Sequence, residues 1–248
     1  MSYSNFKKLH QQDKALILGN VWDAQSAKLA ENAGFQALGS SSHAIANLLG
    51  YEDGEQISVD ELLFMVERIV KVVKIPVSVD FEAGYSDKPE VVAQNVKKLI
   101  DLGVAGINLE DGKVVKGVRK LSKSAILADK IQAIKAENKN IFINARIDTY
   151  TTKQENALEE SIKRAEIYQK AGADGLFIPL LEKTSDIKTM LRATSLPINL
   201  FLTPKLKYEA ISKLGIKRLS CGAKVFEWLV AQNGKTFSEY LKNPKLPK

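Results

Sequence analysis

Short apolar runs alternate along the chain with stretches in which apolar residues recur every three or four positions. A short apolar run is typical of a strand covered on both faces, and the three-to-four spacing predicts an amphipathic helix. We expect eight strands, near residues 15–18, 37–41, 76–80, 105–109, 141–146, 175–179, 197–202 and 217–221. The helical patterns follow them, at 24–33, 61–73, 90–103, 125–138, 157–172, 186–194, 207–215 and 223–233.

One junction between helix and strand recurs four times. A helical stretch ends close to a glycine and an apolar run follows, at the segments that start with Ala33, Leu102, Ala171 and Leu214. Glycine at such a point is typical of a left-handed helix C-cap. Alternating helices and eight strands predict a closed parallel (β/α)8 barrel. An open doubly wound sheet is the alternative, although such sheets usually contain fewer strands.

Length and composition agree with this fold class. The 248 residues match the usual length of one such barrel, and no linker divides the chain, so we expect a single domain over residues 1–248. The only cysteine, Cys221, excludes an intrachain disulfide and a cysteine-rich metal site. The polar N-terminus does not resemble a secretory signal, and no apolar run approaches the roughly 20 residues that span a bilayer. We therefore expect a cytoplasmic protein without a membrane partner.

The charge is mildly basic, with 36 Lys and Arg against 29 Asp and Glu, a formal net charge of +7. The basic residues are scattered, and no stripe of arginine interleaved with aromatic residues suggests nucleic acid as a partner. Most of the excess is typical of solvated helix faces. A positive field can also attract small anions, so we expect a small anionic substrate.

Acidic residues gather where the predicted strands end. In a (β/α)8 barrel the active site lies at the carboxyl ends of the strands. Asp80 and Glu82 are two residues apart and would point the same way on a strand, and Glu110 ends the next strand. Such a cluster stays ionised only with compensation, which Mg²⁺ with its preference for oxygen ligands would supply. Helix capping and solvated loops are the alternative explanation.

Other polar residues end neighbouring strands. Arg146 interrupts an apolar strand, and its planar fork suits a substrate carboxylate or phosphoryl group, unless it forms a structural pair with Asp148. Trp22 could line a pocket or fill the core, and His10 is expected to be exposed in the polar N-terminal segment. Further candidates for substrate binding are Ser40, Ser41, Ser42 and Asn199.

Several motifs in series resemble the isocitrate lyase/phosphoenolpyruvate mutase superfamily, most closely its short phosphoenolpyruvate-mutase-like branch. They are GNVWDAQSAKLAENAGFQALGSSS, LGYEDGE, PVSVDFEAGY, GINLEDG and NARID. The resemblance implies a barrel whose last helix is swapped between subunits of a homodimer or homotetramer. It also implies Mg²⁺, with Mn²⁺ as the alternative. The implied reaction breaks or rearranges a C–C or P–C bond beside a 2-oxo or enol carboxylate, through an enolate.

The resemblance also assigns roles to residues. Asp53 falls on an acidic residue of the loop after the second strand, and Arg146 on the arginine that binds the substrate carboxylate. The serine turn at residues 40–42 is similar to the substrate-binding turn of the family. Asp80, Glu82 and Glu110 match its metal-site acids.

The segment after the fourth strand departs from the family pattern. It reads EDGKVVKGVRKLS and is expected to form a mobile closing loop. Lys116 falls on the catalytic lysine, but Val118 stands where lyases of the family carry a cysteine and Pro179 replaces an acid of some lyase branches. A lyase reaction with a cysteine acid is therefore disfavoured. Decarboxylation, C–C hydrolysis or retro-aldol cleavage, and a phosphonomutase or phosphonopyruvate hydrolase reaction stay open, as does a non-catalytic protein that binds metal and oxo acid.

Overall fold

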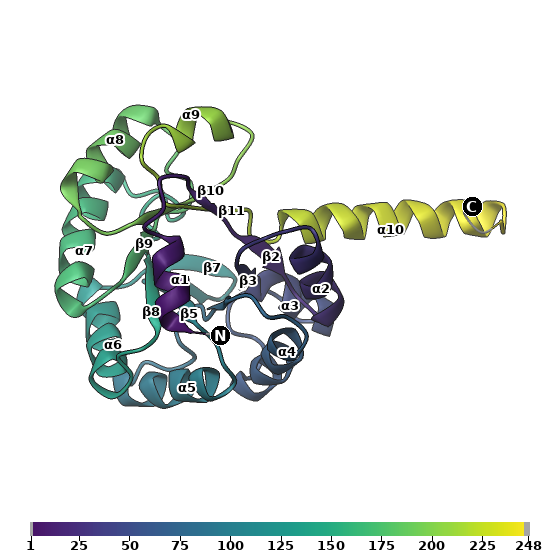
Figure 1. The fold of residues 1–248 in the computed structure, drawn as a ribbon, viewed down its shortest axis with the longest axis horizontal. Helices are drawn as coiled ribbons and strands as arrows, with labels where there is room; N and C mark the ends of the chain where they lie inside the picture. The colour runs from purple at the N-terminus through teal and green to yellow at the C-terminus, as the bar shows by residue number, and fades with distance from the viewer. Residues whose placement is uncertain (1, 246–248) are drawn as a thin grey trace.

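The computed structural model describes residues 2–245, in which nine parallel strands form one sheet that curls into a barrel with helices around it (Figure 1). The strands follow the order β1-β11-β10-β9-β8-β5-β4-β3-β2. The predicted (β/α)8 barrel is confirmed. The nine strands are β1 (Leu16–Ile17), β2 (Gly19–Val21), β3 (Leu38–Ser40), β4 (Val77–Asp80), β5 (Gly106–Glu110), β8 (Phe142–Arg146), β9 (Gly175–Phe177), β10 (Ile198–Phe201) and β11 (Arg218–Ser220).

The first predicted strand is split in two. β1 pairs with β11, whereas β2 pairs with β3, and Leu18 alone separates them. Because one short segment pairs with both edges of the sheet, it closes the barrel. Eight strand segments therefore become nine paired strands.

The helices surround the barrel at the predicted positions, with two additions and one extension. The N-terminal segment forms α1, α3 follows the serine turn directly, and the last helix extends beyond its predicted end. The bounds are α1 (Tyr3–Leu9), α2 (Ala24–Asn32), α3 (Ser42–Leu49), α4 (Val59–Lys71), α5 (Pro89–Asp101), α6 (Ser124–Glu137), α7 (Ala157–Ala171), α8 (Thr184–Ala193), α9 (Tyr208–Ser212) and α10 (Lys224–Lys242).

The expected mobile loop is instead a β-hairpin. β6 (Gly112–Val115) pairs antiparallel with β7 (Val118–Leu121) across the two-residue turn Lys116–Gly117. Both turn residues have positive φ angles, 52° and 75°, as a tight hairpin turn requires. The segment therefore has its own regular backbone pairing.

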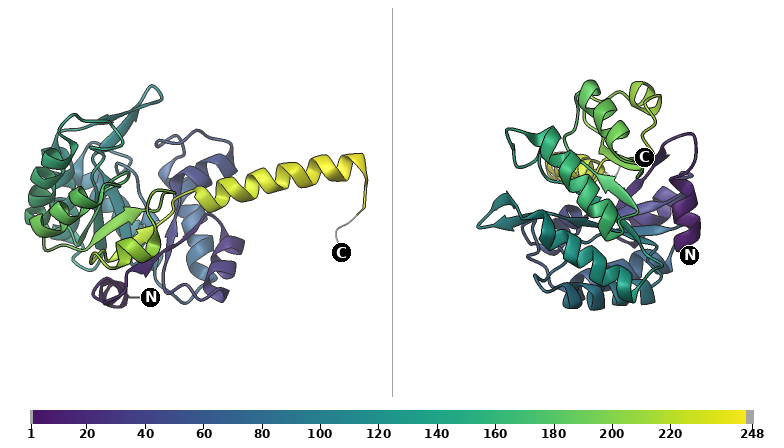
Figure 2. Two further views of the ribbon diagram at one scale, coloured as in Figure 1. Left: turned by 90° about the horizontal axis from the view of Figure 1, so that it is seen from above. Right: turned by 90° about the vertical axis from the view of Figure 1, so that its left-hand side faces the viewer.

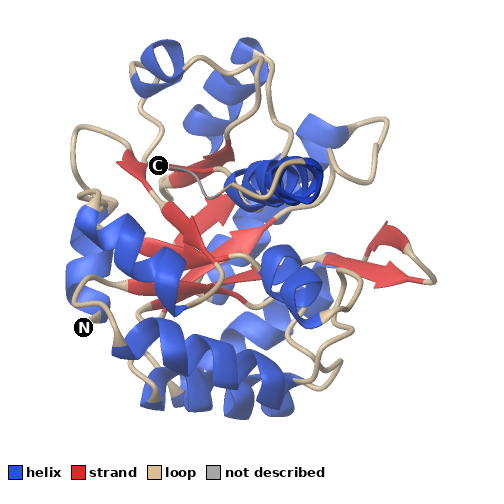
Figure 3. Cartoon of the chain, turned by 90° about the vertical axis from the view of Figure 1, so that its right-hand side faces the viewer, coloured by secondary structure: helices blue, strands red, loops and turns tan. Residues whose placement is uncertain are grey.

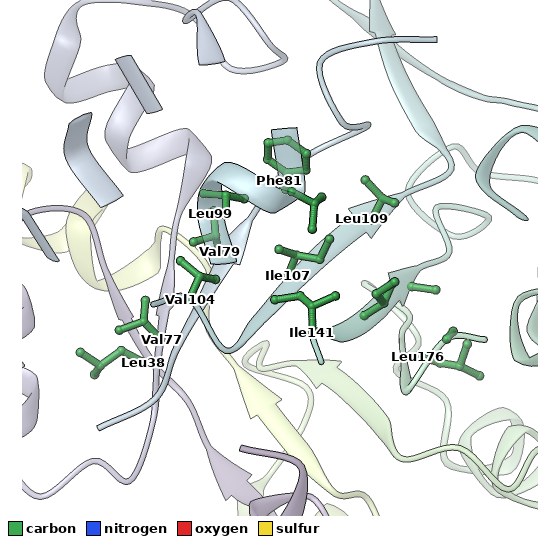
Figure 4. Close-up of a cluster of buried hydrophobic side chains, with 14 of the residues drawn as sticks. Leu38, Val77, Val79, Phe81, Leu99, Val104, Ile107, Leu109, Ile141 and Leu176 are labelled. Atoms are coloured by element: carbon green, nitrogen blue, oxygen red, sulfur yellow. The ribbon is translucent and has the colours of Figure 1, made fainter. Parts of the chain in front are cut away.

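The two faces of the barrel strands differ in polarity. Side chains that point outward, including Val79, Ile107 and Leu109, pack with the helices in an apolar layer (Figure 4). Alternate residues point inward. The guanidinium of Arg218 on β11 donates to the Asn108 amide oxygen on β5, at 3.3 Å, although these strands are not neighbours. The bond therefore crosses the barrel interior, which is polar above its apolar base.

That base is formed by α1. Phe6 is fully buried and meets Phe142 edge to face, with ring centroids 5.3 Å apart. His10 stacks on Phe142 at 4.2 Å and is buried, so the expectation that it is exposed was wrong. Burial, followed by the positive charge of Arg218, lowers the pKa of His10 to about 3. The polar N-terminal segment thus covers the amino end of the barrel with one amphipathic helix turned inward.

The last helix, α10, projects away from the barrel (Figures 1 and 2), and Figure 3 views the molecule nearly along it. Phe237 and Leu241 lie far out on this helix and are 74% and 86% exposed. Across residues 2–245, the structure contains no helix whose length and apolar character would allow it to cross a bilayer.

Replacement of His10 should flatten the acid side of the stability profile. In the unfolded chain this histidine binds a proton near pH 6.5, whereas in the folded protein it does so only near pH 3. The free energy of unfolding therefore falls as the pH drops through this window. In His10→Gln this contribution, up to about 1.4 kcal/mol per pH unit, is absent. Urea denaturation between pH 4 and 7 measures it. The control Gln11→Ala changes an exposed, non-titrating neighbour and should keep the wild-type slope. Parallel profiles for wild type and His10→Gln would contradict the burial of a neutral imidazole.

Candidate active site

A cavity of about 310 Å³ opens at the carboxyl ends of the strands, which we call the barrel cavity. The structure brings six of the residues predicted from the sequence to its wall. They are Ser40, Ser41, Ser42, Asp53, Asp80 and Arg146. Their arrival from four separate segments supports the placement of the site at this edge.

Asp80 is the acid of the cavity wall that neighbouring polar groups hold in place. Its Oδ2 accepts from the Ser42 hydroxyl at 2.8 Å, and its backbone N–H donates to the Ser40 Oγ at 2.9 Å. The side-chain amide of Asn108 lies 3.4 Å from Oδ1. The serine turn therefore positions the Asp80 carboxylate. The N–H of Ser41 donates to the Val21 carbonyl and is not open to a ligand.

Next to Asp80 lie four alternating charges, Arg119, Glu110, Arg146 and Asp148, which we call the charge ring. Arg146 places Nη1 2.8 Å from Glu110 Oε2, and its Nε and Nη2 each lie 2.9 Å from Asp148 Oδ1. Arg119 on β7 donates from Nη1 to Glu110 Oε1 and, at 3.1 Å, to Asp148 Oδ2. Arg146 thus forms the structural pair with Asp148 and lines the barrel cavity as well.

In the charge ring, burial raises the pKa of the carboxyl groups, and the paired arginines lower it. Burial raises the pKa of Glu110, whereas Arg146 and Arg119 oppose the rise and favour its ionised form. For Asp148, burial is outweighed by the same two arginines, which hold its pKa below the ordinary value. Buried carboxylates of this kind are stable only beside hydrogen-bonded cations.

A second network holds Asp148 in place. The Asp148 N–H donates to Asp111 Oδ1 at 2.8 Å, and Asp111 Oδ2 accepts from Arg164 Nη1 at 2.9 Å and from the Tyr168 hydroxyl at 2.7 Å. Gly112 begins β6 beside Asp148. A Cβ at Gly112 would lie 2.2 Å from Asp148 Oδ2, so only glycine permits this approach.

Glu82 lies behind the cavity wall. It is buried, and it accepts from the Glu55 N–H at 2.8 Å and from the Tyr85 hydroxyl at 3.1 Å. Burial, followed by the neighbouring Glu110 and Asp80, raises the pKa of Glu82 to about 9. The predicted acids are therefore crowded, but only Asp80 of the three lines the barrel cavity.

Three other predicted residues are not brought to the barrel cavity. Lys116 is exposed at the turn of the β6–β7 hairpin. Trp22 lines a separate apolar groove and packs against Phe226, with ring centroids 5.1 Å apart. Asn199 is buried in the barrel interior, where its Oδ1 accepts from the Ser220 hydroxyl at 3.3 Å. Trp22 and Asn199 were predicted from their positions at strand ends, but neither side chain lines the cavity, whereas Lys116 was predicted from the family resemblance and lies at the hairpin turn.

The donor set is suited to Mg²⁺ held largely through water. Asp80 offers carboxylate oxygens to the cavity, and Mg²⁺ typically uses one or two carboxylates and keeps several waters. Within residues 2–245, no three His, Cys, Asp or Glu side chains stand close enough to enclose a metal by themselves. Asp80 would therefore bind the ion directly, and the buried acids behind it would act through water.

Sequence reasoning missed Arg119, Asn108 and Arg218. Arg218 interrupts an apolar strand as Arg146 does, so the same reasoning could have found it. Asn108 links Arg218 to Asp80 through its oxygen and its amide nitrogen. Arg119 had no comparable local signal, because its segment was interpreted as a mobile loop.

Known proteins resemble the chain over nearly its whole length. The sequence pattern of the family described as phosphoenolpyruvate phosphomutase matches residues 6–241. An uncharacterized protein of Mycobacterium tuberculosis is 35% identical over 219 residues, 88% of this chain and 82% of the relative. A 2-methylisocitrate lyase of Escherichia coli is 30% identical over 198 residues, 77% of this chain and 66% of the relative.

A solved structure agrees with these relatives. A candidate phosphonomutase from Burkholderia cenocepacia is 33% identical and superposes with a TM-score of 0.87. The match covers 98% of this chain and 99% of the other. The fold and the order of the barrel elements are thus shared over the whole length.

Substitution of Gly112 should disrupt the charge ring. In Gly112→Ala the new methyl group displaces the Asp148 carboxylate, which leaves Arg119 and Arg146 without one partner. We expect the free energy of unfolding to fall by about 3–5 kcal/mol, as when a buried ion pair is broken. Chemical denaturation followed by circular dichroism measures the change. The control Gly234→Ala lies in α10 with open space around it and should not be destabilised; equal losses in both variants would contradict the tight fit.

Proposed function

The chain belongs to the phosphoenolpyruvate phosphomutase family, and on that premise we propose a Mg²⁺-dependent enzyme that acts on a small oxo acid. The reaction cleaves or rearranges a C–C or P–C bond next to a 2-oxo or enol carboxylate, through an enolate. The observation that carries the proposal is the barrel cavity, where Asp80 meets the arginines of the charge ring. Its volume of about 310 Å³ suits a small acid.

The chain contributes positioning and charge. When bound, Mg²⁺ would stabilise negative charge on the substrate oxygens as a Lewis acid. Ser40 and Ser42 hold Asp80 in the orientation that binds the ion. Arg146 lines the cavity and supplies a permanent positive charge that attracts and orients a substrate carboxylate, which brings the reacting atoms together.

The position of the single cysteine favours decarboxylation or hydrolysis over a lyase reaction with a cysteine acid. Cys221 lines the separate apolar groove rather than the barrel cavity, and its N–H donates to the Asn20 side chain at 2.9 Å. Burial raises the pKa of its thiol. Lys116 receives no step in this proposal, because the hairpin holds it at an exposed turn.

We also propose that the protein is a homodimer or homotetramer in which α10 packs on a second copy. Trp228, Phe237 and Leu241 give α10 an apolar surface that its own barrel leaves exposed. An apolar groove of about 500 Å³ lies beside the start of the helix, with Trp22 and Phe35 in its wall. Exposed apolar surface of this kind is typical of association sites.

The metal assignment is tested by a panel assay with Mg²⁺. The substrates are oxaloacetate, 2-methylisocitrate, isocitrate, alkylmalates, phosphoenolpyruvate and phosphonopyruvate, with product identification. Asp80→Asn should lower Mg²⁺-dependent turnover at least about 100-fold, because Lewis-acid stabilisation is worth several kcal/mol. The control Asp87→Asn removes an exposed acid that pairs with Lys113 and should leave turnover unchanged.

Two outcomes would overturn the proposal in different ways. Full activity in Asp80→Asn would refute the metal assignment. Tight, Mg²⁺-dependent oxalate binding to the wild type without turnover of any substrate in the panel would indicate the non-catalytic binding protein instead.

The oligomer is tested by light scattering. The wild type should have at least twice the 27.4 kDa mass of one chain. The double variant Phe237→Glu and Leu241→Glu places charges on the exposed apolar face and should yield monomers with unchanged circular dichroism. Lys235→Glu, an exposed change on the same helix, should leave the mass unchanged. A wild-type monomer would contradict the proposal.

A further inference from the structure

Arg119, Arg146 and Arg218 line the barrel cavity. Arg218 donates to Asn108 in the barrel interior, whereas Arg119 and Arg146 belong to the charge ring, where their nitrogens are engaged to different extents. All three guanidinium nitrogens of Arg146 lie at 2.8 or 2.9 Å from carboxylate oxygens of Glu110 or Asp148. Arg119 uses only Nη1 for these acids. Within residues 2–245, its Nε and Nη2 have no hydrogen-bond partner, and neither nitrogen is fully buried. Arg119 therefore retains two donor nitrogens.

These two nitrogens form one edge of the guanidinium. An edge of this kind donates two parallel N–H bonds, a geometry that matches the two oxygens of a carboxylate, phosphonate or phosphate. The Arg119 side chain is 18% exposed and lines the barrel cavity. It also lines an outer groove beside the hairpin, so it stands between the cavity and that groove. The Arg119 side chain is thus accessible from both the barrel cavity and the outer groove.

The backbone of the hairpin places Arg119 there. Arg119 pairs with Val114 in the β6–β7 register, and the Ser122 N–H returns to the Asp111 carbonyl at 2.8 Å. The Val114 side chain packs against the backbone of the loop at Gly54, where an added Cβ would lie 2.6 Å away. Glu110 and Asp148 then fix one end of the guanidinium. The other edge is held in position before any ligand arrives, which reduces the ordering cost of binding.

We propose that Arg119 binds a second anionic group of the substrate. The inference rests on the proposed function, in which Asp80 and Arg146 hold the oxo-carboxylate end. Arg119 then recognises the further carboxylate or phosphonate that the substrates of the panel carry and that pyruvate lacks. Because an arginine stays protonated at neutral pH, Arg119 binds and orients this group and transfers no proton.

The test compares ligands with and without the second anionic group. Calorimetry with Mg²⁺ measures the affinity for oxalate, 3,3-difluorooxaloacetate and sulfopyruvate. Oxalate represents the oxo-carboxylate end alone, because its second carboxylate takes the place of the enolate oxygen at C2 and it has no group beyond C2. The other two add a carboxylate or a sulfonate, the latter as the counterpart of a phosphonate. The larger loss in an Arg119 variant identifies which second group the edge prefers.

Arg119→Lys is the main variant, because it keeps a cation beside Glu110 and Asp148 but loses the double-donor edge. Arg119→Ala removes both. We expect Arg119→Ala to weaken at least one two-anion ligand about 10- to 100-fold, as the loss of a charged hydrogen bond predicts, with oxalate affinity changed less than about 3-fold. Arg119→Lys should recover part of this loss. The control Lys120→Ala removes a neighbouring exposed cation of β7 and should leave all three affinities unchanged.

Two results would overturn the proposal. One is an equal loss for oxalate and both larger ligands, which would mean that Arg119 acts only through Glu110 and Asp148. The other is unchanged binding of every ligand in both Arg119 variants. Failure of wild-type protein to bind oxalate with Mg²⁺ would instead refute the proposed function, so the two failures are distinguishable. Thermal unfolding of each variant shows whether it is folded, and Arg119→Lys decides the matter if Arg119→Ala is not.

Discussion

The structure of the site depends on two carboxylates, Glu110 and Asp148, buried at the carboxyl edge of the barrel. Ionised groups in such a place are costly unless cations with good geometry lie beside them. Arg146 on β8 and Arg119 on β7 meet this requirement from two separate segments. The charge ring therefore ties the hairpin to the barrel strands. It also fixes Arg119 and Arg146, which both line the barrel cavity.

The barrel interior extends this polar organisation below the cavity. Arg218 donates to Asn108, and Asn108 in turn approaches Asp80, so a chain of polar groups crosses the barrel beneath the acid that would bind Mg²⁺. Phe6 and Phe142 close the base against water. Inside such an enclosed space electrostatic interactions are stronger than in water. The apolar base thus excludes water, and the polar groups above it lie against the Asp80 carboxylate.

The hairpin gives this chain a different cavity wall from the one that the family resemblance implies. The two-residue turn leaves Lys116 exposed. Arg119, which pairs with Val114 in the hairpin, lines the cavity instead. A lysine on a closing loop can move a proton, whereas a paired arginine supplies a fixed charge. Cys221 lies in a separate groove, and Lys224, the amine that lines the described cavity, pairs with Glu227 at 2.7 Å. The difference disfavours a reaction in which a cysteine or the loop lysine transfers a proton.

The strands, most of the helices and the edge at which polar residues gather follow from local periodicity and from the direction of a parallel barrel, so the amino-acid sequence alone predicts them. It therefore placed Asp80, the serine turn and Arg146 at the cavity. Folding in three dimensions places Trp22 and Lys116 elsewhere, buries His10 and brings Arg119 into the charge ring, and local patterns did not predict these positions. Their positions depend on side-chain direction and on partners far away in the chain. Burial and charge pairing act across space, so a contact between residues far apart in the chain leaves no pattern in the local sequence.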